Sequence, residues 1–383
     1  MRRRIGLFFA SWLVSGAWLG CNLILGNESA VFVPLEGGSA AGDGSTLDAV
    51  VTTDGSSNDG GSEDAGPCVD VASNPKHCGA CFHDCLGGQC IAGMCQPVEL
   101  ATDESGPYAI AVDATHVYWS NRATGDLWRV PIAGGPKERL FDGPSDTHGD
   151  EFAVHDGMVY FPTQIGDAGV VRCPVTGCPD PGPEPVIENG TAATSVAIED
   201  GVILFVESEV GGRVGRCPLP CTGNFEIVAS GEMLPLRAAQ SGNVVAWSII
   251  TNDVRIKVGD EPVFSVPTKN GFATGIAISG GLVYAQEHNV GPLVFPTDGG
   301  PRERLTTDGF SFSEELTLDD ANVYFTDTTE NGRVVRCART GCGDSGVTLA
   351  TNQSRPRGIA VDGKSVYWVS AGGASGRIMR VAK

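Results

Sequence analysis

The chain has 383 residues, of which 53 are glycine and only 19% are charged, and its formal net charge is −20. This length is sufficient for a sizeable core, and the many glycines indicate a turn-rich, mostly β protein. The negative charge argues against nucleic acid or an anionic membrane surface as a partner, because both would repel the chain.

Residues 1–20 predict a signal peptide. Three arginines precede an apolar run, residues 5–19, that is too short to span a bilayer comfortably. This order of a basic and an apolar segment is typical of export signals, so we expect the protein to leave the cytoplasm.

The end of this segment resembles a bacterial lipobox, because Leu19, Gly20 and Cys21 match its pattern, whereas Trp18 departs from it. The resemblance implies that Cys21 is lipidated and becomes the mature N-terminus. Asn22, by analogy with enteric sorting, favours the outer membrane. Ordinary signal-peptidase cleavage without a lipid is the alternative.

Residues 21–66 are predicted to contain this lipidated N-terminus and a linker. Residues 37–66 are rich in Gly, Ser, Asp and Ala and cannot bury enough apolar surface to fold. A flexible chain of this length spans roughly 30 Å, enough to hold a domain away from a membrane.

Residues 67–96 contain six cysteines in a segment too small for a hydrophobic core. We expect a module held by three disulfides, formed by Cys68, Cys78, Cys81, Cys85, Cys90 and Cys95. The spacing leaves fifteen connectivities open. Zinc is the competing interpretation, because Cys78 and Cys81 have ligand spacing and His77 and His83 lie close by.

One pattern of apolar strands and Gly-rich turns recurs from residue 97 to 383. Its second strand reads "VYWS" at 117, "VYFP" at 159, "ILFV" at 203, "VAWS" at 245, "VYAQ" at 283, "VYFT" at 323 and "VYWV" at 366. A repeat of about 40 residues with four short strands is the signature of a β-propeller blade, so seven copies predict seven blades.

Seven residues before each aromatic position stands a small residue, which we expect to pack at the crowded centre of the ring. These residues are Ala111, Ala153, Ala197, Ala239, Ala277, Thr317 and Ala360.

The last repeat supplies three strands only, while "PVELATDES", residues 97–105, precedes the first repeat and resembles a fourth strand. We therefore expect residues 98–102 to pair with the third strand of the last blade and close the ring. The predicted fold is an all-β, seven-bladed β-propeller closed by an N-terminal strand and preceded by the disulfide-rich module.

The remaining cysteines occur in pairs at the turn between the third and fourth strands of three blades. We expect each pair, Cys173 with Cys178, Cys217 with Cys221 and Cys337 with Cys342, to clip its own hairpin. Arginines at one recurring third-strand position are expected to pack blade against blade; they are Arg129, Arg172, Arg216, Arg336 and Arg380.

The segments "AVDATHVYWSN" and "AVDGKSVYWVS" resemble repeats of YWTD and NHL-type propellers, a group that includes receptor modules, periplasmic scaffolds and a minority of enzymes. YWTD propellers usually have six blades, and this chain has seven repeats. We expect a monomeric, non-catalytic binding scaffold for a protein or glycan at the cell envelope, attached to the membrane through its lipid alone. The alternative is a metal-dependent enzyme of lactonase or lyase type acting at the channel mouth.

The loops that enter the first strands should form one face around the channel, and function on such scaffolds concentrates in loops. Their residues are not uniform, and we expect a partner to bind there through Tyr108, Asp150, Glu151, Arg237, Glu314, Glu315 and Arg357.

Two of these loops are acidic and should face each other across the channel. No cofactor is certain, but Asp150, Glu151, Glu314 and Glu315 form a candidate site for Ca²⁺ or Mg²⁺. Neutralisation of these carboxylates by Arg237 and Arg357, or solvation, is the alternative.

Overall fold

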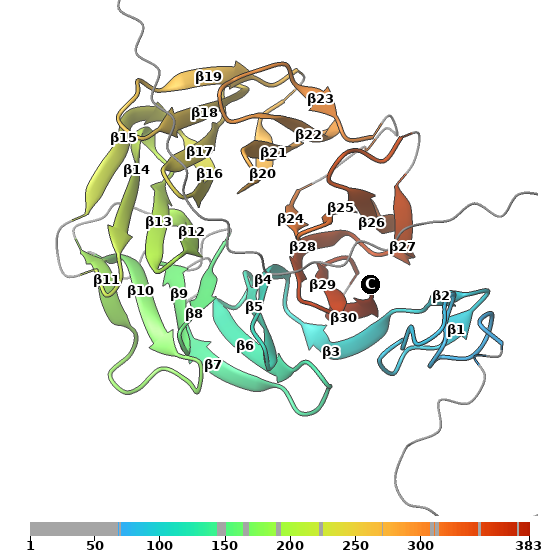
Figure 1. Cartoon of the computed structure of the whole chain (residues 1–383). Coiled ribbons are helices and arrows are strands. Elements are labelled where there is room, and N and C mark those ends of the chain that lie inside the picture. The colour runs from blue at the N-terminus through green and yellow to red at the C-terminus, as the bar shows by residue number, and fades with distance from the viewer. Residues whose placement is uncertain are drawn as a thin grey trace, which may run out of the picture. The chain divides into compact units, whose positions relative to one another are not determined.

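A computed structural model describes residues 68, 70–143, 151–163, 168–188, 193–221, 225–269, 271–306, 310, 314–343, 346–373 and 375–383. The predicted signal peptide, Cys21 and the predicted linker lie outside the described residues. In the part that is described, every regular element is a β-strand, and none is a helix able to cross a membrane. Figure 1 shows the strands as successive sheets around a ring.

Seven four-stranded antiparallel sheets make up the seven predicted blades. The first blade contains β4 (Pro107–Val112), β5 (His116–Asn121), β6 (Asp126–Pro131) and β7 (Glu138–Asp142). The second contains β8 (Ala153–His155), β9 (Met158–Pro162), β10 (Ala168–Pro174) and β11 (Glu184–Glu188). The third contains β12 (Ala193–Glu199), β13 (Val202–Glu207), β14 (Val210–Pro218) and β15 (Glu226–Met233). The fourth contains β16 (Pro235–Ser241), β17 (Val244–Ile249), β18 (Asp253–Val258) and β19 (Phe264–Pro267). The fifth contains β20 (Ala273–Ser279), β21 (Leu282–Glu287), β22 (Gly291–Pro296) and β23 (Glu303–Arg304). The sixth contains β24 (Leu316–Leu318), β25 (Asn322–Asp327), β26 (Gly332–Ala338) and β27 (Val347–Gln353).

The seventh blade joins the two ends of the repeat region, as predicted. Its strands are β28 (Pro356–Val361), β29 (Ser365–Ser370), β30 (Gly376–Ala382) and β3 (Val98–Glu104). Val98 pairs with Arg380 and Glu104 with Gly376, so the N-terminal strand covers the edge that the last repeat leaves open.

Each small first-strand residue pairs across the first hairpin with the residue seven positions later. Ala111 pairs with Tyr118 and Ala360 with Tyr367, and the other blades follow the same register. Only Ala360 is buried, at 8% exposed; the other six are half-buried. A ring of seven blades leaves a central channel, so these residues line that channel instead of filling a closed centre.

The hydrophobic core lies between neighbouring blades. The largest fully buried side chains include Trp119, Trp247 and Trp368, which stand at the same second-strand position in three blades. Trp119 of the first blade packs in one cluster with Ile378 of the last blade and Leu100 of the closing strand. Burial of such aromatic side chains is the main energy that holds adjacent blades together.

The segments "AVDATHVYW" and "AVDGKSVYW" owe their likeness to a shared turn. Asp113 accepts hydrogen bonds from the backbone N–H of Thr115 (2.7 Å) and His116 (2.7 Å) and from the Tyr118 hydroxyl (2.6 Å). Asp362 makes the equivalent bonds in the last blade, including one from the Tyr367 hydroxyl at 2.8 Å. The repeated Asp and Tyr therefore stabilise the first hairpin, which is a structural task.

The third-strand arginines differ from the prediction. Arg129, Arg172 and Arg216 pair with glutamates on the neighbouring fourth strand of their own blade: Glu138, Glu184 and Glu226. The expected blade-to-blade packing is wrong for these three, because a glutamate stands directly opposite each arginine on the next strand and pairs with it.

In the seventh blade, Val98 stands in the position of that glutamate, opposite Arg380. Arg380 therefore has no carboxylate on the neighbouring strand at that position and makes other contacts. Arg380 is 6% exposed and donates to the backbone oxygens of Ile132 in the first blade and Leu86 in the cysteine module. One buried guanidinium thus connects the last blade, the first blade and the module.

The module contains the short hairpin of β1 (Cys90–Ile91) and β2 (Met94–Cys95). Its disulfides join Cys68 to Cys81, Cys78 to Cys90 and Cys85 to Cys95. Because all six cysteines are paired, none offers a thiolate, so the zinc alternative is not supported. The three blade pairs form the predicted clips: Cys173 with Cys178, Cys217 with Cys221 and Cys337 with Cys342.

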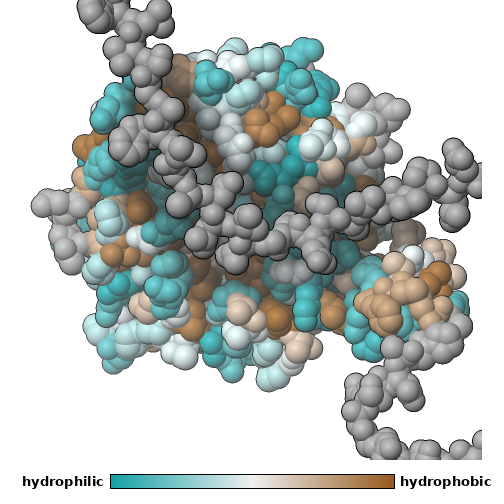
Figure 2. Space-filling view, in the orientation of Figure 1, coloured by the Kyte–Doolittle hydropathy of each residue, from teal (hydrophilic) through white to brown (hydrophobic). Residues whose placement is uncertain are grey.

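Apolar side chains are conspicuous on the surface of this module in Figure 2, at the place where Figure 1 labels β1 and β2. Phe82, Ile91 and Met94 are each more than half exposed. The disulfides, in place of a buried core, hold these residues in position, as expected for so small a segment.

Candidate binding site at the channel mouth

The predicted site residues stand where the first strands of the blades begin. Tyr108 is on β4, Glu151 precedes β8, Arg237 is on β16, Glu314 and Glu315 precede β24, and Arg357 is on β28. First strands begin at the same rim of the ring, so side chains distant in sequence meet there. Asp150 lies outside the described residues.

Glu315 is the best evidence that these side chains converge. Burial raises the pKa of its carboxyl to about 8; Arg237 opposes this shift, whereas the nearby negative charges of Glu151 and Glu314 add to it. The backbone N–H of Ile359 also donates to this carboxyl group. Glu315 thus keeps its proton to a higher pH than an ordinary glutamate and lies within electrostatic reach of blades two, four and seven.

The other two glutamates have partners. The Ser195 hydroxyl donates to Glu151 Oε2 at 2.5 Å, and Arg357 Nη2 lies 3.4 Å from Glu314 Oε1. Arg237, only 6% exposed, favours the ionised form of Glu315. The pair of Arg357 and Glu314 agrees with the alternative in which arginines neutralise the carboxylates, whereas burial outweighs the effect of Arg237 on Glu315.

The metal hypothesis gains no support from the described residues. Among them, the only group of three metal-ligating residue types with ligand atoms close together is Cys78, Cys85 and Cys95, and all three are in disulfides. Asp150, one of the four predicted ligands, is not part of the described chain.

A cavity of about 200 Å³ opens at this mouth. Its lining contains Tyr108, Leu236, Arg237, Phe272, Thr274, His288 and Glu314. The rings of Phe272 and His288 are stacked, with centroids 5.4 Å apart and planes 5° apart. The cavity therefore offers a flat aromatic wall together with charged groups of both signs.

The repeat pattern does not predict Phe272 and His288 as site residues. Phe272 lies just before β20, and His288 lies in the turn after β21. His288 N–H donates to Phe272 O at 3.1 Å, which brings the two loops together. Neither residue recurs in the other blades, so the repeat carried no signal for them.

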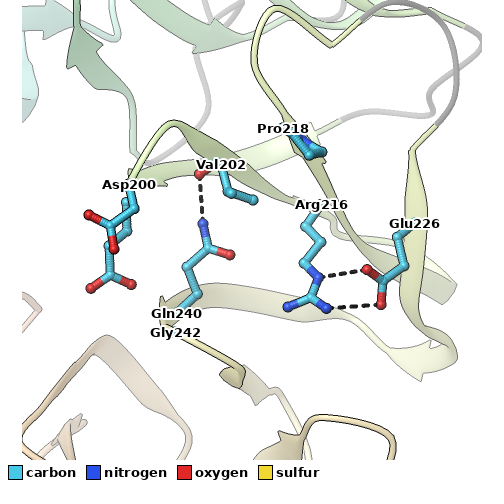
Figure 3. Close-up of a pocket in the computed structure, with 8 residues that line it drawn as sticks. Asp200, Val202, Arg216, Pro218, Glu226, Gln240 and Gly242 are labelled. Atoms are coloured by element: carbon cyan, nitrogen blue, oxygen red, sulfur yellow. Dashed lines mark hydrogen bonds and ion pairs between the residues drawn. The ribbon is translucent and has the colours of Figure 1, made fainter.

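A second cavity, of about 270 Å³, lies between the third and fourth blades near the hairpin turns (Figure 3). Arg216 makes two hydrogen bonds to Glu226, at 2.8 and 3.2 Å, and Gln240 Nε2 donates to Val202 O at 2.7 Å. Gln240 thereby links β16 to β13, and we interpret this cavity as a joint between blades.

No protein-family model and no curated protein matches this sequence. Solved structures do match. Virginiamycin B lyase from Staphylococcus aureus has a TM-score of 0.59 and 16% identity, covering 75% of this chain and 98% of that protein. A streptogramin B lyase structure has a TM-score of 0.58 and 16% identity, covering 75% and 97%. The WD40 β-propeller domain of Doa1 has a TM-score of 0.58 and 12% identity, covering 74% and 96%.

These likenesses show the fold and nothing finer. Identities of 12–16% leave function open, and the three structures include both lyases and a WD40 domain. The chain is a seven-bladed β-propeller preceded by a disulfide-bonded module.

Proposed function

We propose that this protein is an exported, lipid-anchored protein of the cell envelope whose propeller binds a protein or glycan partner without catalysis. The proposed export agrees with its six disulfides, which form and persist in oxidising compartments. The proposed anchor is Cys21, which the sequence pattern alone supports.

The observation that carries the proposed binding is the cavity of about 200 Å³ at the channel mouth. Its aromatic wall of Phe272 and His288 combines with Tyr108 and with charged groups, a lining typical of sites that recognise polar partners. A position with a purely structural task would tend to repeat around the ring, as Asp113 and Asp362 do, whereas these lining residues do not repeat.

The test is capture of a partner from envelope extracts by the immobilised protein, followed by binding of the identified partner in purified form. The variant replaces Tyr108, Phe272 and His288 by alanine. A matched control, Asp320→Ala with Lys364→Ala, changes exposed residues in turns at the opposite rim. We expect the first variant to lose the partner at an unchanged melting temperature, and the control to keep it. Equal binding by both would contradict the proposal.

A second candidate is an enzyme of lactonase or lyase type at the same mouth. Glu315 favours it, because a carboxyl with a pKa of about 8 can donate a proton at neutral pH. Two of the similar structures are also lyases by name. The assay follows virginiamycin B and a panel of lactones by mass spectrometry, with Glu315→Gln as the variant. The enzyme hypothesis is favoured if the wild-type protein turns over a substrate and a folded Glu315→Gln variant does not. If the wild-type protein turns over none of these substrates, the enzyme hypothesis is rejected for them.

A further inference from the structure

A separate cavity of about 290 Å³ lies at the seam between the seventh and first blades. Tyr108, Arg122, Arg355 and Arg357 line it, together with small residues such as Gly106 and Ala371. Of the described residues in this lining, three are arginines and none is acidic. In a chain with a net charge of −20, such a concentration of positive charge is a local reversal of the overall balance.

The guanidinium groups of this cavity are arranged around Tyr108. The Arg122 and Arg357 guanidinium carbons lie 5.0 and 5.2 Å from the centre of the tyrosine ring. These contacts hold the two long side chains in place in the free protein. Binding of a ligand therefore costs less side-chain conformational entropy than it would with mobile arginines.

Two of the arginines also contact carboxylates outside the cavity lining. Arg357 pairs with Glu314 and Arg355 with Glu330. A guanidinium has five N–H donors, and one carboxylate uses two at most. Arg357 Nε is buried without a hydrogen-bond partner among the described residues, so this side chain keeps capacity for a further acceptor.

The size and the neighbours of the cavity limit the ligand. A volume of about 290 Å³ is at the small end of the range for small-molecule sites and suits one sugar ring. Tyr108 also lines the aromatic cavity at the channel mouth, so the two cavities lie side by side. A saccharide could place an acidic unit among the arginines and the next unit against Phe272 and His288.

We propose that the arginine cavity binds the carboxylate of an acidic sugar unit, so that the partner is an anionic glycan. Planar guanidinium groups match a carboxylate with paired hydrogen bonds, which gives both attraction and orientation. This inference rests on the proposed binding function and names the chemical class of its partner.

The test is calorimetric titration of the purified full chain with digalacturonate. Digalactose is the matched neutral probe, and inorganic phosphate is the probe for a general anion site. We expect digalacturonate to bind at least tenfold more tightly than digalactose or phosphate, and the affinity to fall as salt is raised. Phosphate binding as tightly as the uronate would mean a general anion site and would overturn the sugar assignment. No digalacturonate binding at millimolar concentration would overturn it as well.

Variants locate the site. Arg122→Gln and Arg355→Gln should each weaken digalacturonate binding about tenfold, because each removes charged hydrogen bonds. Arg139→Gln is the control, since Arg139 is exposed and paired with Asp142 away from the cavity. If Arg122→Gln fails to fold, Arg122→Lys is the second variant, because lysine keeps the positive charge. Arg122→Lys should still weaken digalacturonate binding, since lysine lacks the planar guanidinium that pairs with a carboxylate. Equal affinity in Arg122→Lys and the wild type would contradict the proposed geometry.

The two proposals can fail separately. If digalacturonate does not bind but the Tyr108, Phe272 and His288 variant loses its captured partner, the acidic-glycan inference is wrong and the binding function stands. If digalacturonate binds and that variant still captures its partner, the cavity is correct and the proposed docking through the aromatic cavity is wrong.

Discussion

Replacement of Glu104 should weaken the closure of the ring more than any other single change in the closing strand. Glu104 is 3% exposed on β3. Its Oε2 accepts hydrogen bonds from Trp119 Nε1 (2.7 Å) and Asn121 Nδ2 (2.8 Å) in the first blade, and its Oε1 accepts one from Lys137 Nζ. One carboxylate therefore joins the closing strand of the seventh blade to the first blade.

The magnitude follows from burial. In Glu104→Ala the Trp119 and Asn121 donors, 0% and 3% exposed, lose this acceptor in a place that water does not reach, at a cost of roughly 1–3 kcal/mol each. Lys137 is one-third exposed and regains water, so its loss is smaller. We expect a total loss of about 3–5 kcal/mol, which corresponds to a fall in melting temperature on the order of 10 °C.

Glu99→Ala is the matched control, because Glu99 lies on the same strand and its ion pair with Arg377 is exposed on both sides. Such a pair contributes about 0–1 kcal/mol. Urea unfolding followed by tryptophan fluorescence and circular dichroism measures both variants. If Glu104→Ala loses no more stability than Glu99→Ala, the carboxylate does not hold the seam and the reasoning is wrong.

Three further predictions concern other parts of the molecule. Since the folded pKa of Glu315, about 8, is above its ordinary value of 4.5, its contribution to stability is present below pH 4.5 and is lost as the pH rises to about 8. Glu315→Gln should therefore flatten this pH dependence and raise the free energy of unfolding at pH 8 by a few kcal/mol in urea titrations; a variant with the wild-type slope would contradict the assignment. Intact-mass measurement should give an oxidised chain about 12 Da lighter than the reduced one, for six disulfides, and peptide mapping should recover Cys68 with Cys81; any other partner for Cys68 would contradict the connectivity. Arg380→Ala should speed proteolytic cleavage between the cysteine module and the ring, because the buried contacts to Leu86 and Ile132 are lost, whereas Arg336→Ala should not; equal cleavage rates would count against the docking role.

The fold was predictable because it repeats. Seven copies of the second strand, spaced about one blade apart, predicted the number of blades, and the structure confirms it. The incomplete last repeat predicted the closing strand in the same way. A periodic pattern reports the average environment of a position, and this is sufficient for strands whose environments are alike.

The site was predictable only in part, since it depends on what differs between blades. Counting back from the repeat located Tyr108, Arg357 and Glu315 at the channel mouth. Arg122 and Arg355 lie in loops and reach the arginine cavity from two blades far apart in sequence. No spacing within the repeat therefore predicts them as site residues. The connectivity of the module was open for a similar reason, because disulfide pairing depends on how the loops cross. Gly79 shows one crossing: a Cβ there would lie 2.4 Å from Gly93 O.

The placement of the module has a mechanical consequence. The segment that closes the ring follows the module directly in sequence, so tension applied to the chain ahead of Cys68 runs toward β3. Pulling along β3 would shear its hydrogen bonds to β30 together and would open the seam of the propeller. The disulfides carry this load across the module, and the contact of Arg380 with Leu86 directs part of it into the last blade before it reaches β3. A pull on the chain ahead of Cys68 therefore has to break the contact between Arg380 and Leu86 before it loads the pairing of β3 with β30.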